Sequence, residues 1–141
     1  MNVSTKGRYA VSIMVDLAEH NNGEFQPLAD IAKRLKKSEK YLEAIVSLLS
    51  KGGLVQSLRG KGGGYRLVRE PEAYTVGEII RQTEGEFHLV SYGAKEVQET
   101  PSYSKTIGVW SGLQKTVQDY FDGITIKDLV DTTPVVDNYV I

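Results

Sequence analysis

The chain has 141 residues, with 17 Lys and Arg, 18 Asp and Glu, two His and no Cys. This length suits one domain, or a small domain with an appended helix, and 40% apolar with 25% charged residues is typical of globular proteins. No window approaches about 18 uncharged apolar residues, so we expect no membrane span. The first residues lack the apolar core of a signal peptide, which predicts a cytoplasmic protein. The lack of Cys excludes disulfides, thiolate nucleophiles and Cys-ligated metal sites.

The net charge of −1 hides a basic half and an acidic half. Residues 1–70 carry 12 basic and 7 acidic side chains, whereas residues 71–141 carry 5 and 11. The interval 33–69 has 10 basic residues against only Glu39 and Glu43. This asymmetry is typical of a protein that binds a polyanion with one side only, but a solvated Lys-rich surface has the same composition.

The first half of the chain predicts three helices followed by a β-hairpin. Ser4 or Thr5 can cap a first helix that ends near residues 21–23, and a short second helix follows Pro27. Ser38 is a good N-cap for a third helix, which we expect to end at residues 52–53. Two extended runs, 54–58 and 65–68, flank a glycine-rich tip at 59–64. This order predicts a mainly α-helical fold with a small β-hairpin, the winged helix-turn-helix.

The second half predicts short helices, a loop and one long amphipathic helix. Thr75 and Glu78 form a capping-box pattern, residues 84–105 are typical of a loop, and Thr125 opens a last short helix. A long helix is expected over about 106–121, and its apolar stripe comprises Ile107, Trp110, Leu113, Val117 and Phe121. One isolated stripe needs a partner, which is either a second copy of the chain or its own first helix.

These patterns divide the chain into four functional regions. Residues 1–70 form the expected DNA-binding domain, and residues 71–105 hold a short helix and a candidate effector loop. Residues 106–133 hold the dimerisation helix and the last short helix. Residues 134–141 are a C-terminal tail.

Residues at the start of the third helix and at the hairpin tip are the candidates for DNA contact. The N-terminal residues of a recognition helix face base edges in the major groove, and here they are Ser38, Glu39, Lys40, Tyr41 and Glu43. A carboxylate close to DNA is repelled unless it accepts from a cytosine amino group, so Glu43 either recognises a base or pairs with a basic side chain such as Lys40.

The hairpin tip carries the stronger signal. Arg59, Gly60 and Lys61 begin a tip whose glycines let the backbone approach a sugar–phosphate surface, and Arg suits a narrow A·T-rich minor groove. No phosphate-loop pattern is present, because no GxxxxGK[ST] occurs and no helix follows the glycines. Lys6 and Arg8, at the start of the first helix, are expected to bind phosphates.

Enzyme signatures are weak. His20 and His88 are the only histidines, and neither accompanies a Ser or Asp in a triad pattern. The carboxylates of Glu84 and Glu86 lie in a polar stretch typical of a solvated loop. We therefore expect a protein that is not an enzyme and uses no metal or other cofactor.

Four segments resemble the Rrf-two family of bacterial transcription regulators. They are STKGRYAV (4–11), SEKYLEAIVSLLSKGGLVQSLRGKGGGYRL (38–67), TVGEIIRQTEG (75–85) and ITIKDLV (124–130). The resemblance covers about residues 1–130 and implies a homodimeric repressor that binds palindromic double-stranded DNA operators and dimerises through its long helix. By position, the family's DNA contacts fall on Ser38, Lys40, Tyr41, Glu43 and Arg59, which favours base recognition by Glu43.

The chain departs from the iron–sulfur members of that family. These members place three Cys before the long helix, the last of them six residues before a Trp. With Trp110 as the anchor, the three positions fall on Tyr92, Gln98 and Ser104, and the His of some members falls on Ile107. Phenol, amide, hydroxyl and alkyl groups do not replace thiolates as iron ligands, so no cluster is expected.

The C-terminal sequence DNYVI is similar to the end of serine acetyltransferases, whose terminal Ile carboxylate binds in the active site of cysteine synthase. A family member that represses cysteine-metabolism genes also lacks the cluster residues and has a similar tail. The resemblance thus implies control of cysteine or sulfur metabolism, with cysteine synthase bound by Tyr139, Val140 and Ile141.

Three alternatives to this interpretation stay open. In the first, the tail packs on its own chain. In the second, the protein responds to a small molecule or a redox signal in another pathway, and in the third it is a protein–protein adaptor that has lost DNA binding.

Overall fold

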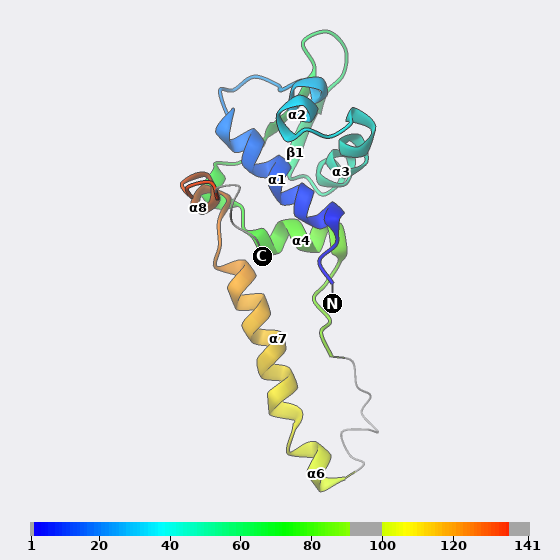
Figure 1. The fold of residues 1–141 in the computed structure, drawn as a ribbon, viewed down its shortest axis with the longest axis vertical. Helices are drawn as coiled ribbons and strands as arrows, with labels where there is room; N and C mark the ends of the chain where they lie inside the picture. The colour runs from blue at the N-terminus through cyan, green and yellow to red at the C-terminus, as the bar shows by residue number, and fades with distance from the viewer. Residues whose placement is uncertain (1, 91–99, 136–141) are drawn as a thin grey trace.

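A compact N-terminal part and one long helix that extends from it make up the fold (Figure 1). The computed structural model describes residues 2–90 and 100–135. The compact part contains α1 (Thr5–Glu19), α2 (Leu28–Leu35), α3 (Glu39–Lys51), β1 (Val55–Leu58), β2 (Gly64–Leu67), the 3-10 helix η1 (Pro71–Ala73) and α4 (Val76–Glu84). The later elements are α6 (Pro101–Ser104), α7 (Ile107–Asp122) and α8 (Ile126–Val130). This order confirms the predicted mainly helical fold with a small hairpin.

Side-chain caps start α1 and α3 at the predicted residues. The Ser4 hydroxyl accepts from the Gly7 N–H, and the Ser38 hydroxyl accepts from the Tyr41 N–H, both at 3.1 Å. Each bond satisfies one of the free N–H groups in the first helical turn. The end of α3 is also as predicted, because Gly52 follows it directly.

The main core lies between α1, α2, α3 and the hairpin, and later segments complete it. Each of the three helices contributes its apolar face, including Ile13, Ile31 and Ile45. Tyr74, just before α4, and Ile126, in α8, are fully buried in the same cluster. The residues after the hairpin therefore share the core of the N-terminal part, and α8 packs on α1.

The hairpin is antiparallel, with Val55 opposite Leu67 and Leu58 opposite Gly64. The first strand begins one residue later than the predicted run 54–58, and the second lies one residue earlier than the predicted run 65–68. A short bridge that the sequence does not predict adds Gln26 beside β2, since Gln26 and Tyr65 exchange backbone hydrogen bonds of 2.8 and 2.9 Å. A Cβ atom at Gly64 would overlap the Gln26 carbonyl, so this close approach requires glycine.

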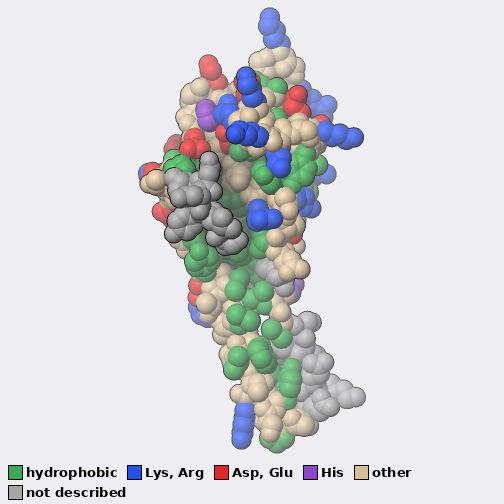
Figure 2. Space-filling view, viewed as in Figure 1, with side chains coloured by type: hydrophobic (Ala, Val, Ile, Leu, Met, Phe, Trp, Pro, Cys, Tyr) green, Lys and Arg blue, Asp and Glu red, His purple; other side chains and the backbone are tan. Residues whose placement is uncertain are grey.

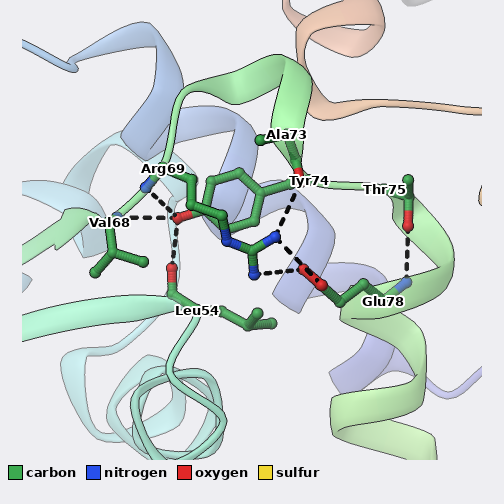
Figure 3. A network of polar contacts seen from close by, with 7 residues as sticks. All are labelled: Leu54, Val68, Arg69, Ala73, Tyr74, Thr75 and Glu78. Atoms are coloured by element: carbon green, nitrogen blue, oxygen red, sulfur yellow. Dashed lines mark hydrogen bonds and ion pairs between the residues drawn. The ribbon is translucent and has the colours of Figure 1, made fainter.

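Tyr74 joins the base of the hairpin to the start of α4 (Figure 3). Its buried hydroxyl accepts from the backbone N–H groups of Val68 and Arg69, at 2.9 and 3.0 Å, and donates to the Leu54 carbonyl at 2.8 Å. The Arg69 guanidinium lies 4.4 Å from the centre of the Tyr74 ring and pairs with Glu78 at 2.7 Å. Both ends of the hairpin are thereby held against α4.

The capping box predicted at Thr75 is only half formed. Thr75 accepts from the Glu78 N–H at 3.1 Å, but the Glu78 carboxylate pairs with Arg69 rather than with the Thr75 N–H. The physical reason is that the guanidinium offers the carboxylate two hydrogen bonds from a positively charged donor, where the cap offers one bond from a neutral backbone N–H. A complete box is present at α8, between Thr125 and Asp128.

The predicted loop over 84–105 is confirmed at residues 85–90, which form no helix or strand, but Glu84 belongs to α4 and residues 101–104 form a helix. Phe87 is almost fully buried, in a small second cluster with Val76 and Ile80 of α4. Near the other end, Thr100 caps the four-residue helix α6. Residues 91–99 lie outside the described residues, and so do the predicted positions Tyr92 and Gln98.

The helix α7 leaves the compact part and packs mainly against α4 at its C-terminal end (Figure 1). None of its residues is fully buried. Phe121, placed in the predicted dimerisation stripe, packs within its own chain instead, with its ring centre 5.2 Å from that of Phe87. The exposed apolar side chains of α7 are Val109, Leu113 and Tyr120. Among the residues that the structure describes, no helix is both long and apolar enough to cross a membrane.

Candidate nucleic-acid interface

The exposed face of α3 carries Lys40 and Glu43, two of the residues predicted to contact DNA. The opposite face is buried through Leu42 and Ile45, which fixes the rotation of the helix about its axis. The first turn of α3 is therefore free to enter a groove of DNA while the rest of the helix stays anchored in the core.

Ser38 and Tyr41 have structural contacts of their own. The Ser38 oxygen accepts the capping bond, yet its hydroxyl hydrogen is still available to donate to a phosphate. Tyr41 is half-buried and packs edge-on against Tyr9 of α1, with ring centres 5.9 Å apart. Lys37 lies 4.9 Å from the centre of the Tyr9 ring. These contacts brace the start of the recognition helix on α1.

A cleft of about 730 Å³ separates α3 from the hairpin, and it unites predicted residues from both elements. Glu43 of α3 lines this cleft together with Arg59 and Gly60 of the hairpin tip. Glu39, which the sequence analysis also placed at the start of the recognition helix, lines the cleft, and so do polar residues that it did not single out: Ser47, Ser50, Lys51 and Ser57. The spacing of Glu39, Glu43 and Ser47 by four residues is the signal that places them on one helix face.

The hairpin tip has a backbone conformation that glycine permits. Gly60 and Gly62 have φ angles of +89° and +77°, in the left-handed region that other residues rarely adopt. A Cβ atom on Gly63 would overlap the Leu58 carbonyl. Arg59 and Lys61 are exposed on this tight tip, so two cations project on a narrow support beside the cleft.

Lys6 and Arg8 lie on the first turns of α1, and both are exposed. Arg8 donates to the Thr5 hydroxyl at 3.2 Å, and neither side chain lines the cleft. The structure therefore groups Glu43, Arg59 and Gly60 in one cleft, and it places Lys6 and Arg8 on a separate element.

Three of the ten basic residues in 33–69 use their side chains in hydrogen bonds or ion pairs within the fold. Arg34 pairs with the buried Asp16 through two hydrogen bonds of 2.9 Å, and this hydrogen bonding raises the pKa of Arg34. Arg66 donates to Gln56 and to a backbone carbonyl, while Arg69 pairs with Glu78. The predicted basic surface is thus smaller than the sequence count suggests.

The other seven basic residues make no ion pair within residues 2–90 and 100–135: Lys33, Lys36, Lys37, Lys40, Lys51, Arg59 and Lys61. Figure 2 shows Lys and Arg gathered mainly over the part of the molecule that holds α1–α3 and the hairpin, whereas hydrophobic side chains extend along α7. One end of the molecule is therefore suited to a polyanion, and the other to an apolar partner.

The positions that correspond to cluster ligands do not fit an iron–sulfur group. The Ser104 hydroxyl donates to the Pro101 carbonyl at 2.9 Å, and Ile107, with no donor atom in its side chain, begins α7. The chain has no Cys to supply thiolates. In the described part of the chain, no three His, Asp or Glu side chains gather as a metal-binding group, and His20 and His88 lie far apart in the sequence.

A capped recognition helix, a glycine-tipped hairpin and a basic surface around both define a winged helix-turn-helix protein. The model of the Rrf2 family, described as an iron-dependent transcriptional regulator, matches residues 3–132. The chain belongs to this family of transcription regulators, the Rrf-two family that its motifs resemble.

Relatives and a solved structure agree with this assignment. The chain is 41% identical over 133 residues to the regulator CymR of Bacillus subtilis, covering 94% of this chain and 92% of CymR. It is 37% identical over 131 residues to the regulator IscR of Erwinia tasmaniensis, covering 93% of this chain and 79% of IscR. The solved structure of Bacillus subtilis CymR, titled the global cysteine regulator, matches with a TM-score of 0.81 and 39% identity, over 95% of this chain and 99% of that one.

Proposed function

We propose that this protein is a homodimeric, non-enzymatic repressor that binds palindromic DNA operators with α3 in the major groove and the hairpin tip in the adjacent minor groove. The observation that carries the proposal is the cleft in which Glu43 and Arg59 face a common space. A lone carboxylate is unfavourable beside DNA, but one that shares a cleft with a guanidinium and faces base edges can accept from a cytosine amino group.

The surrounding cations supply affinity without sequence preference. Lys40 and Lys61 are exposed on the two DNA-contacting elements, and Lys6 and Arg8 are exposed on α1, which packs against α3, so all four can bind phosphates beside the grooves. Arg59 adds selectivity for a narrow A·T-rich minor groove, because the electrostatic potential there is more negative.

Two substitutions test this assignment. Glu43→Ala should lower the ratio of specific to random DNA binding by about fivefold or more, and change binding to random DNA by less than about twofold. Arg59→Ala should weaken binding, most at an A·T-rich flank. Mobility shifts at two salt concentrations measure both effects, on operators obtained by genome-wide mapping of bound sites.

Matched controls are Glu72→Ala, in η1, and Lys105→Ala, beside α6, which change the same charges outside the cleft. An equal effect of Glu43→Ala on specific and random DNA would show that Glu43 does not recognise a base. Wild-type binding that is weak and insensitive to salt would instead favour an adaptor without DNA binding, since phosphate contacts weaken steeply as salt rises.

The exposed side of α7 supports the homodimer. Val109, Leu113 and Tyr120 are 60%, 47% and 66% exposed, and they lie at helical spacing on one stretch of the helix. Within the described residues α7 packs mainly on α4 near its C-terminal end, and Gln114 also holds residues 87–89, whereas Val109, Leu113 and Tyr120 stay exposed. A second copy of α7 would bury these side chains and place two recognition helices on one operator.

Leu113→Asp tests the dimer. This substitution should convert the protein to monomers in sedimentation and abolish binding to a full palindrome, because a charge on a shared apolar surface is costly to bury. Val68→Asp is the matched control, since Val68 is 48% exposed but lies outside both α7 and the cleft. A Leu113→Asp variant that remains dimeric would show that α7 is not the interface.

Ser104 stands where a thiolate ligand would be and Ile107 where an imidazole ligand would be, which supports a regulator without an iron–sulfur cluster. The likeness to CymR supports a role in cysteine or sulfur metabolism. The tail residues Tyr139, Val140 and Ile141 lie outside the described residues; their sequence alone supports cysteine synthase as a partner. Pull-down of the synthase by the full chain, and its loss when residues 139–141 are deleted, tests this partner. Equal capture by both chains would refute it.

A second candidate function, a response to a small molecule, has one specific observation in its favour. A cavity of about 450 Å³ lies between residues 86–90 and α7, with Phe87, Trp110 and Gln114 among its walls. Gln114 also holds this segment, since its amide accepts from the Leu89 N–H at 3.0 Å and donates to the Phe87 carbonyl. A ligand there should quench Trp110 fluorescence and alter DNA affinity together, and quenching without any change in affinity would count against such a role.

A further inference from the structure

The helix α4 contacts every part of the proposed DNA-binding machinery through a different side chain. Glu78 pairs with Arg69 at the base of the hairpin, and Gln82 donates to the Leu48 carbonyl of α3 at 2.9 Å. Glu84 accepts from the backbone N–H and the hydroxyl of Ser4 at the start of α1. These three contacts make α1, α3, the hairpin and α4 one rigid unit.

Arg81 is the α4 residue that joins this unit to α7. Its guanidinium donates to both carboxylate oxygens of Asp122, at 2.7 and 2.8 Å, and Asp122 is the last residue of α7. The same guanidinium lies 4.6 Å from the centre of the Phe87 ring and 3.6 Å from the Glu86 carboxylate. A planar guanidinium bound to both oxygens sets direction as well as distance, which a single hydrogen bond does not.

The backbone at this junction leaves little room for a second arrangement. A Cβ atom on Gly77 of α4 would overlap Oδ1 of Asp122, so the carboxylate occupies the space that a side chain would take. Phe121 and Phe87 pack beside the pair on its apolar side. The ion pair is therefore clamped between a glycine backbone and an aromatic cluster, and the angle between α4 and α7 is correspondingly restricted.

We propose that the Arg81–Asp122 pair is a positioning element that sets the angle between the DNA-binding unit and α7, and thereby the half-site spacing that the dimer accepts. This inference rests on the proposed function. If two copies join along α7, any rotation at the junction changes the separation of the two α3 helices. The first turn of α3 at Glu39 lies nine residues, or about 13 Å of helix, from Leu48, where Gln82 holds α3 next to Arg81, so a rotation of about 15° at the junction moves that turn by about 3.5 Å, close to one base-pair step.

The test measures spacing preference rather than affinity alone. A palindrome selected from random duplex DNA by the wild-type protein is lengthened or shortened at its centre by one and two base pairs, and a single half-site duplex is added. We expect the wild type to prefer its selected spacing by about tenfold over either neighbour. Asp122→Asn should reduce this preference to under about threefold and leave half-site affinity within about twofold.

Two further variants make the test decisive. Asp131→Asn is the matched control, because it removes the 2.9 Å ion pair with Lys127 inside α8 and joins no two elements; it should keep the wild-type preference. Arg81→Lys keeps the charge and loses the contact with both carboxylate oxygens, so it should reduce the spacing preference as Asp122→Asn does. It replaces Asp122→Asn in the test if that variant does not fold.

Each other outcome refutes a different claim. If a folded Asp122→Asn or Arg81→Lys variant retains the wild-type spacing preference, this inference is overturned while the proposed function stands. The same holds if the variant loses affinity for the half-site duplex and for the full palindrome equally. If the wild type enriches no palindromic DNA, the proposed function fails first and this inference with it.

Discussion

Replacing Tyr74 by Phe tests how the hairpin is held to the core. The substitution removes one oxygen atom and keeps the ring, so packing of the fully buried side chain should change little. The lost hydroxyl leaves the N–H groups of Val68 and Arg69 and the carbonyl of Leu54 without the partner that they have in the structure.

The expected cost follows from these three hydrogen bonds. Each contributes about 1 kcal/mol net, and leaving a buried group unsatisfied costs about 1–3 kcal/mol. Because the two N–H groups lie where the hairpin ends, water can reach part of this site once the hydroxyl is gone, so we expect a loss of about 2–4 kcal/mol in the free energy of unfolding. For a chain of 141 residues, such a loss lowers Tm by about 10 °C.

Urea unfolding at neutral pH, followed by circular dichroism, measures this loss. The control is Tyr120→Phe, whose hydroxyl lies on the exposed side of α7, and its expected effect is under about 0.5 kcal/mol. If Tyr74→Phe lowers the free energy of unfolding by no more than the control does, the network in Figure 3 does not hold the hairpin.

Two other predictions concern backbone space and charge. Gly64→Ala should lower the free energy of unfolding by about 2 kcal/mol or more, because the new Cβ overlaps the Gln26 carbonyl. The control is Gly53→Ala, which lies at positive φ in open space and should therefore show only the cost of the backbone conformation, about 1 kcal/mol. Equal losses for the two variants in urea unfolding would contradict the overlap. Hydrogen bonds from Arg81 lower the pKa of Asp122 below 3.8, so the stabilisation by this carboxylate is complete above its unfolded pKa and is lost as the pH falls through the folded value. Asp122→Asn should flatten the acid limb of the stability curve, and an unchanged limb would refute the pairing.

The DNA-contact candidates could be named from the sequence because their signals are local. Ser38 marks the start of a helix, its following residues reach solvent at fixed spacing, and a run of glycines marks the tip that carries Arg59. None of these inferences needs to know what lies across the fold. That Glu43 and Arg59 line one cleft depends on how the hairpin packs beside α3, which no local pattern states.

The wrong predictions have a common cause. Glu78 matched a capping pattern, but Arg69, nine residues earlier, offered its carboxylate a stronger partner. Phe87 lay in a polar stretch, and only the meeting of α4 with Phe121 of α7 made a buried site for it. Similarly, Arg34 counted toward the basic surface until Asp16 proved to be its partner.

The sequence by itself determined the order of the helices, their caps and the glycine tip, since these depend on residues within about four positions of one another, and it indicated the family through four motifs along the chain. Only the tertiary structure decided which basic side chains are free for a polyanion, which part of α7 stays uncovered, and how α4 joins α7 through Arg81 and Asp122. Charges and apolar surfaces select partners by distance in space, and residues 41 positions apart in the chain become neighbours only when the whole fold has formed.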